Sequence, residues 1–127
     1  MTEDEILHVK AFFEKGRSER FAEVGDKEKQ RAKWTDKLNH SPGLKSEHIS
    51  WLPSKTDIFT ELKKKGAPDT CAIISNSSRL DGKTIPLDEA INEVKHDGWG
   101  SVLICIPGKL GYYYGELGER RGLLIRP

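Results

Sequence analysis

Thr70-Cys-Ala-Ile-Ile-Ser75 is a short apolar run, and Ser101-Val-Leu-Ile-Cys-Ile106 is a second one. A strand without polar alternation is typically covered on both of its faces, so the runs predict central strands over 71–75 and 102–106. The segment between the two runs has the spacing of an amphipathic helix. Its apolar residues recur at i, i+3, i+4 and i+7: Leu87, Ala90, Ile91 and Val94. We therefore expect a helix over 86–96 and a right-handed crossover that leaves the two strands parallel.

The residues after this unit predict two further strands. Pro107-Gly108 suits the central positions of a type II turn. Beyond it, Leu110–Glu116 is expected to return antiparallel to 102–106, and Arg121–Arg126 to form a last strand. Residues 70–127 would then be a β-α-β-β-β unit with a small, mixed, four-stranded sheet.

Residues 1–69 form a charged and mainly helical half, with 14 basic and 13 acidic residues. Thr2-Glu-Asp-Glu5 fits a capping box that begins a first helix. Further helices are expected over 18–39, with an interruption near Gly25, and over 56–65. His48–Leu52 suits a short edge strand. The whole predicts one α+β domain over 1–127, with N-terminal helices packed on one face of the sheet and the 86–96 helix on the other.

Composition excludes several classes of protein. Lys and Arg number 21 against 20 Asp and Glu, and this net charge of +1 disfavours nucleic-acid binding, which is usually accompanied by a basic excess. No apolar run reaches the ~20 residues of a membrane helix. Cys71 and Cys105 form no Cys-x-x-Cys pair, so we expect buried thiols and a cytoplasmic protein. The four histidines show no metal-ligand spacing, and we expect neither a metal nor a cofactor.

The segment Ser75-Asn-Ser-Ser-Arg-Leu-Asp-Gly-Lys-Thr84 is the most polar candidate site. It would leave a strand end and enter a helix, where open α/β sheets bind ligands. From Ser77 it differs by one residue from the phosphate loop Gly-x-x-x-x-Gly-Lys-Ser/Thr, but the missing glycine and the charge of Asp81 argue against a nucleotide. A small anion at the helix N-terminus, or an ordinary surface loop, fits better. The candidate ligand-binding residues are Asn76, Ser77, Arg79, Asp81 and Lys83.

The run Tyr112-Tyr113-Tyr114 is the second candidate. On a strand, Tyr112, Tyr114 and Glu116 would share one face and Tyr113 would lie on the other. Phenols beside a carboxylate suit a ligand pocket or a platform for base stacking. Aromatic residues on strands also pack against helices for purely structural reasons.

Three functions fit these observations. The first is a small, soluble, non-catalytic binding or regulatory protein that takes a protein partner or a small anionic ligand, alone or as an oligomer. The second is an enzyme for a phosphorylated or nucleic-acid substrate, in which Arg79 and Lys83 hold phosphate and Asp81 or Glu116 is the general base. The third is a single-stranded RNA binder that uses Tyr112 and Tyr114.

Overall fold

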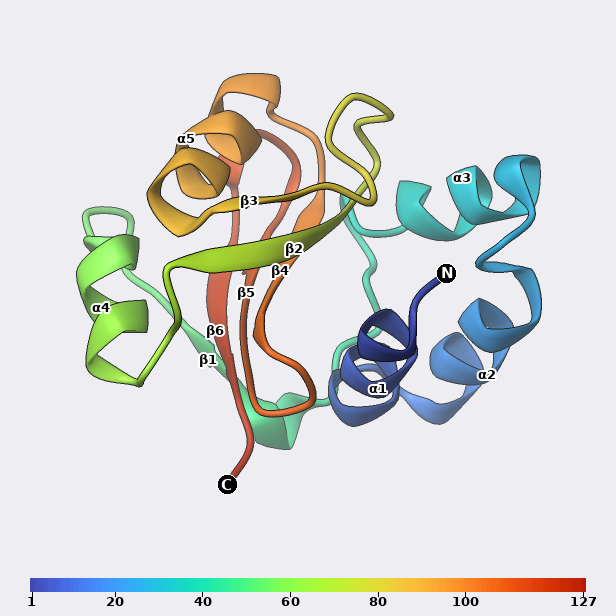
Figure 1. Cartoon of the computed structure of the whole chain (residues 1–127), viewed down its shortest axis with the longest axis horizontal. Coiled ribbons are helices and arrows are strands. Elements are labelled where there is room, and N and C mark those ends of the chain that lie inside the picture. The colour runs from blue at the N-terminus through green and yellow to red at the C-terminus, as the bar shows by residue number, and fades with distance from the viewer.

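The computed structural model describes residues 1–127 as a six-stranded sheet with helices on both faces (Figure 1). The strand order is β1-β6-β5-β4-β2-β3, so the short strands β1 and β3 form the two edges. The strands are β1 (Ile49–Trp51), β2 (Thr70–Ser75), β3 (Thr84–Pro86), β4 (Ser101–Ile106), β5 (Leu110–Tyr114) and β6 (Arg121–Ile125). The helices are α1 (Glu3–Phe12), α2 (Lys15–Val24), α3 (Glu28–Asp36), α4 (Ile58–Lys64) and α5 (Leu87–Asp97).

The α+β class is confirmed, but the four-stranded mixed sheet and its β-α-β-β-β unit are wrong. Every strand pair is antiparallel, including β2 with β4, where Ile73 lies opposite Leu103 and Ser75 opposite Ser101. The reason is β3, which pairs with β2 and returns the chain to the start of β2 before α5 begins. Helix α5 then leads back to the other end of β2, so β4 starts beside Ser75. The sequence analysis placed Thr84 at the end of the polar loop and Pro86 at the start of the helix, with no strand between them, so it did not predict this reversal.

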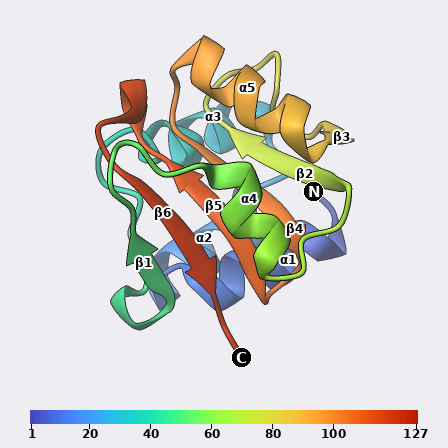
Figure 2. The same ribbon diagram turned by 90° about the vertical axis from the view of Figure 1, so that its left-hand side faces the viewer.

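Helices cover both faces of the sheet, as predicted, but α4 was expected with the other N-terminal helices and instead packs beside α5 on the opposite face. Figure 2 shows α4 in front of the strands and α1 and α2 behind them. Side chains of α1–α3 form one core with β4, β5 and β6 through Val102, Tyr113 and Leu124. Those of α4 and α5 form a second core on the opposite face, which includes Cys71 and Cys105. Both thiols are free and buried, and burial raises the pKa of each to about 12.

Local signals at the ends of elements hold in the structure. The capping box of α1 is formed, because Thr2 Oγ1 accepts from the Glu5 amide and Glu5 accepts from the Thr2 amide. Gly98 ends α5 at φ +78°. Gly108 has φ +74°, and the Lys109 amide donates to Ile106 O at 2.9 Å, as the turn between β4 and β5 requires.

His8 of α1 is fully buried against the β4–β5 hairpin. Its Nδ1 accepts a hydrogen bond from the Gly108 amide at 3.1 Å, whereas its Nε2 has no partner. No carboxylate compensates the loss of water, and burial lowers the pKa of His8 to about 3. The folded protein therefore holds a neutral imidazole at neutral and mildly acidic pH.

This histidine predicts a loss of stability in mild acid. The unfolded chain protonates His8 near pH 6.5 and the folded chain only near 3, so the unfolded state binds the extra proton between these values. The stability that neutral His8 contributes is fully present above pH 6.5 and is lost as pH falls toward 3, by up to about 1.4 kcal/mol per pH unit. Urea unfolding at pH 6.5, 6.0, 5.5 and 5.0, above the ordinary carboxyl range, measures this slope.

His8→Gln keeps an acceptor for the Gly108 amide and removes the titration, so its free energy of unfolding should change less with pH than that of the wild type. His96→Gln, at the exposed end of α5, is the matched control and should keep the wild-type slope. His40 also titrates, with a pKa raised by its hydrogen bond to Glu119 and by the charge of Glu116, but it is present in all three proteins. Equal slopes in the wild type and His8→Gln would contradict the prediction.

Candidate functional site

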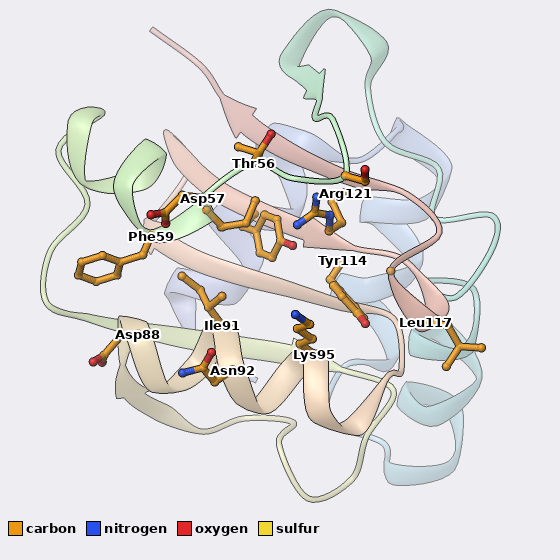
Figure 3. Close-up of a pocket in the computed structure, with 14 residues that line it drawn as sticks. Thr56, Asp57, Phe59, Asp88, Ile91, Asn92, Lys95, Tyr114, Leu117 and Arg121 are labelled. Atoms are coloured by element: carbon orange, nitrogen blue, oxygen red, sulfur yellow. The ribbon is translucent and has the colours of Figure 1, made fainter.

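A cleft of about 450 Å³ lies between α4 and α5, above the strands β5 and β6 (Figure 3). The loop before α4 and the turn after β5 complete its rim. This cleft is wide enough for a small organic ligand. Its lining comprises Ser54, Thr56, Asp57, Ile58, Phe59, Asp88, Ile91, Asn92, Lys95, Tyr112, Tyr114, Leu117, Gly118 and Arg121.

Helix α5 forms one wall because it carries two adjacent stripes. Leu87, Ala90 and Val94 are buried against the sheet. The next stripe, at i, i+3, i+4 and i+7, faces the cleft and is mixed in character: Asp88, Ile91, Asn92 and Lys95. The amphipathic pattern that places the helix on the sheet thus also turns Lys95 toward the cleft.

Tyr112 and Tyr114 form the floor. They lie on one face of β5 and Tyr113 lies on the other, which confirms the predicted alternation. Tyr113 donates its hydroxyl to Leu38 O at 2.6 Å. Tyr114 lines the cleft with no hydrogen bond from its hydroxyl to the protein, whereas the phenol of Tyr112 lies beside Arg121, which partly offsets the effect of burial on its pKa. Burial of the rings raises the pKa of Tyr112 to about 12 and also that of Tyr114, so both hydroxyls are donors at neutral pH.

Arg121 and Lys95 bring two positive charges to the same end of the cleft. Arg121 lies opposite Tyr114 in the β5–β6 register and donates from Nη2 to Pro53 O at 2.8 Å. Neither cation forms an ion pair. Figure 3 shows Lys95 and Arg121 on facing walls beside Tyr114. This end therefore gathers hydrogen-bond donors with no carboxylate to occupy them.

The carboxylates of the cleft lie at its other end, near Phe59 (Figure 3). Each of them accepts a hydrogen bond from a backbone amide in the first turn of a helix. Asp57 is the N-cap of α4 and accepts from the Thr60 amide at 3.2 Å and from Thr60 Oγ1 at 2.9 Å, bonds that lower its pKa. Asp88 accepts from the Glu89 amide in the first turn of α5. Both side chains serve to begin helices.

The polar segment after β2 is engaged within the protein. Arg79 pairs with Glu93 and with Asp97, the latter at 2.7 Å, and Ser77 Oγ donates to Asp97 at 2.6 Å. Asn76 accepts from Asn39 and donates to Thr35 Oγ1. These contacts attach the segment to α5 and to the end of α3.

Asp81 belongs to an ion-pair network that joins three parts of the chain. Arg31 of α3 donates from Nε and Nη2 to the Asp81 carboxylate, at 2.7 and 3.0 Å. It also donates to both Glu5 oxygens and to Gly25 O, so all five of its N–H bonds are used. Burial would raise the pKa of Glu5, but the bonds from Arg31 outweigh it and keep the pKa below its usual value.

Lys83 and Glu116 differ in their surroundings. Lys83 is exposed and makes no ion pair. Glu116 was expected to share the face of Tyr112 and Tyr114, and this is wrong, because β5 ends at Tyr114. The chain turns there into a 3-10 helix, and Glu116 contacts His40 Nε2 at 2.9 Å.

The structure keeps the two predicted groups of site residues apart. Tyr112 and Tyr114 lie in the cleft, whereas Arg79 contacts Glu93 and Asp97 on another side of α5. Figure 1 shows α5 between α4 and the loop that precedes β3. The sequence analysis missed Lys95 and Arg121, for which the available signals were the second stripe of α5 and the register of the last hairpin.

No family model, curated protein or solved structure matches this chain. None of its helices has the length and hydropathy needed to span a bilayer. No three His, Cys, Asp or Glu side chains are arranged as a metal site.

The Arg31 network predicts effects of very different size on stability for two neighbours in the same loop. Asp81→Ala removes one of two carboxylates around a guanidinium that is 13% exposed, and should lower the free energy of unfolding by about 2 kcal/mol or more. Lys83→Ala, whose side chain makes no ion pair, should change it by less than about 0.5 kcal/mol. Urea unfolding at pH 7 measures both, and equal losses would contradict the structural role of Asp81.

Proposed function

We propose that this protein is a non-catalytic binding protein, and that its ligand is a small anion with an apolar body held in the cleft between α4 and α5. The observation that carries the proposal is the pair of cations without ion-pair partners, Lys95 and Arg121, beside the two tyrosine hydroxyls. Donor groups from α5, β5 and β6 thus line the same cleft, and the two cations among them have no carboxylate partner within the protein.

An anion is the chemical class that suits these donors. A guanidinium, an ammonium and two neutral phenols offer N–H and O–H bonds, and hydrogen bonds from charged donors to a carboxylate or phosphate are roughly twice as strong as neutral ones. The Pro53 carbonyl holds Arg121 in place through its Nη2, which reduces the side-chain entropy lost when a ligand binds.

The end of the cleft away from Arg121 suits the apolar part of such a ligand. Ile58, Phe59 and Ile91 line the cleft, and the cavity is far larger than a simple oxyanion requires. Phe59 is 39% exposed, so its ring is available for contact with a ligand. A ligand with a charged group at the Arg121 end and a ring or chain toward Phe59 would meet both environments.

The other two hypotheses draw less support from the geometry. An enzyme built on Arg79, Asp81, Lys83 and Glu116 needs these groups to converge, yet Arg79, Asp81 and Glu116 are engaged in separate contacts. A base-stacking platform needs exposed rings, and Tyr112 and Tyr114 are 2% and 5% exposed. A reducing compartment stays part of the proposal, because both thiols are buried without a bond between them.

The test uses benzoate as the anion and benzamide as its neutral analogue, each titrated into 15N-labelled protein. We expect saturable shifts of the Tyr112, Tyr114 and Arg121 amides with benzoate, and binding of benzamide at least about tenfold weaker. Arg121→Gln should weaken benzoate binding about tenfold or more, because a hydrogen bond to a charged group contributes about 1.5–3 kcal/mol. Lys95→Gln should weaken it in the same direction.

Lys83→Gln is the matched control, since it removes an equal charge from the loop before β3. It should leave benzoate binding unchanged. If the shifts fall instead on residues 76–83 and disappear in Lys83→Gln, the ligand site lies in that loop and the cleft proposal is overturned. Equal affinities for benzoate and benzamide would also overturn it.

A further inference from the structure

A second cavity, of about 150 Å³, lies between α2 and α3, on the face of the sheet opposite α4 and α5. Four basic side chains line it together with Gln30 and Trp34, and no carboxylate does: Arg17, Arg20, Lys33 and Lys37. This concentration of one charge is unexpected in a half of the chain with 14 basic and 13 acidic residues.

Helical spacing explains how the charges gather. On α2, Arg17, Arg20 and Val24 follow each other at i, i+3 and i+7 and so share one stripe. On α3 the matching stripe continues into the C-cap: Gln30, Lys33, Trp34 and Lys37. Trp34 is buried between the helices, and its indole N–H donates to Arg17 O at 2.9 Å. The packing of Trp34 therefore sets the orientation of α3, on which the exposed Lys33 and the following Lys37 line the cavity.

Arg17 is held rigidly but is not neutralised. Its Nε donates to Pro42 O at 3.0 Å and its Nη2 to Trp34 O at 3.1 Å, and its guanidinium carbon lies 4.0 Å from the centre of the Trp34 ring. Only two of five N–H bonds are thus engaged, both by carbonyls. Partial burial without a carboxylate lowers the pKa of Arg17 to about 10, so the group is still charged at neutral pH.

The neighbouring charges are also largely uncompensated. Lys33 and Lys37 form no ion pair, and Arg20 pairs only with Glu23, at 3.2 Å. Glu23 does not line the cavity. An anion bound beside Arg17 would supply the negative charge that this partly buried guanidinium lacks and would also attract the other three cations that line the cavity.

We infer that the cavity between α2 and α3 binds a phosphate group. The cavity has about a third of the volume of the cleft, roughly 150 against 450 Å³, and therefore suits a group as small as one tetrahedral oxyanion better than an aromatic anion. The fixed planar fork of Arg17 matches two oxygens of a phosphate, and the lysines supply additional point charges. This inference does not depend on the proposed function, because the two cavities lie on opposite faces.

The experiment titrates 15N-labelled protein with sodium phosphate at pH 7, against sodium chloride at matched ionic strength. The Trp34 indole N–H and the Arg17 Nε–H are the reporters, because both are fixed at the cavity wall. Phosphate should shift both resonances saturably and chloride should not. The double variant K33Q/K37Q removes two charges and no hydrogen bond found in the structure, and should weaken phosphate binding at least about tenfold.

K27Q/K29Q removes the same charge from exposed positions outside the cavity and should keep the wild-type affinity within about twofold. Phosphoserine and a short oligodeoxynucleotide distinguish a phosphate monoester from a diester as the ligand. If either binds more tightly than inorganic phosphate, and if K33Q/K37Q loses this binding, the result supports the inference and identifies the kind of ester. Shifts that follow ionic strength alone, an unchanged affinity in K33Q/K37Q, or loss of binding in Arg121→Gln instead would overturn it.

Discussion

The ion pairs of the Arg31 guanidinium are the interaction on which the packing of residues 1–69 against residues 70–127 depends. It joins α1 through Glu5, the turn between α2 and α3 through Gly25 O, and the loop before β3 through Asp81. Asp81 in turn accepts from the Ser75 amide at the end of β2. Removing one member would leave charges that are about four-fifths or more buried without their partners, which is far more destabilising than the pair is stabilising.

This network also shows why a local pattern is a poor guide to a ligand site. A loop with Ser, Arg, Asp and Lys in close succession has the composition of an anion site, yet Asp81 finds its partner 50 positions away and Arg79 finds Glu93 and Asp97 on the next helix. An intramolecular partner satisfies the same hydrogen bonds that a ligand would. Sequence spacing identifies polar groups, but only the tertiary fold shows which of them are still free.

Patterns with a fixed geometric period were predicted well, and features that depend on pairing between distant segments were not. The alternation of Tyr112, Tyr113 and Tyr114 placed two rings in one core and one in the other, and the helical spacing over 87–94 placed α5. The strand direction failed because β3 has only three residues, too few for a periodic signal. Arg121 was missed for a related reason, since its place beside Tyr114 follows from the register of β5 with β6.

The net charge of +1 does not show how the fold distributes the acidic and basic side chains. Many carboxylates are engaged by ion pairs and helix caps, as with Glu5, Asp57 and Asp97, while Lys33, Lys37, Lys95 and Arg121, which line the two cavities, form no ion pair. Balanced totals therefore constrain the long-range field, which weakens within about 10 Å at moderate salt, and say little about a partly buried cavity a few ångströms across. A near-neutral protein can therefore still have cavities whose unpaired charged side chains are mainly cations, as in the two cavities of this fold.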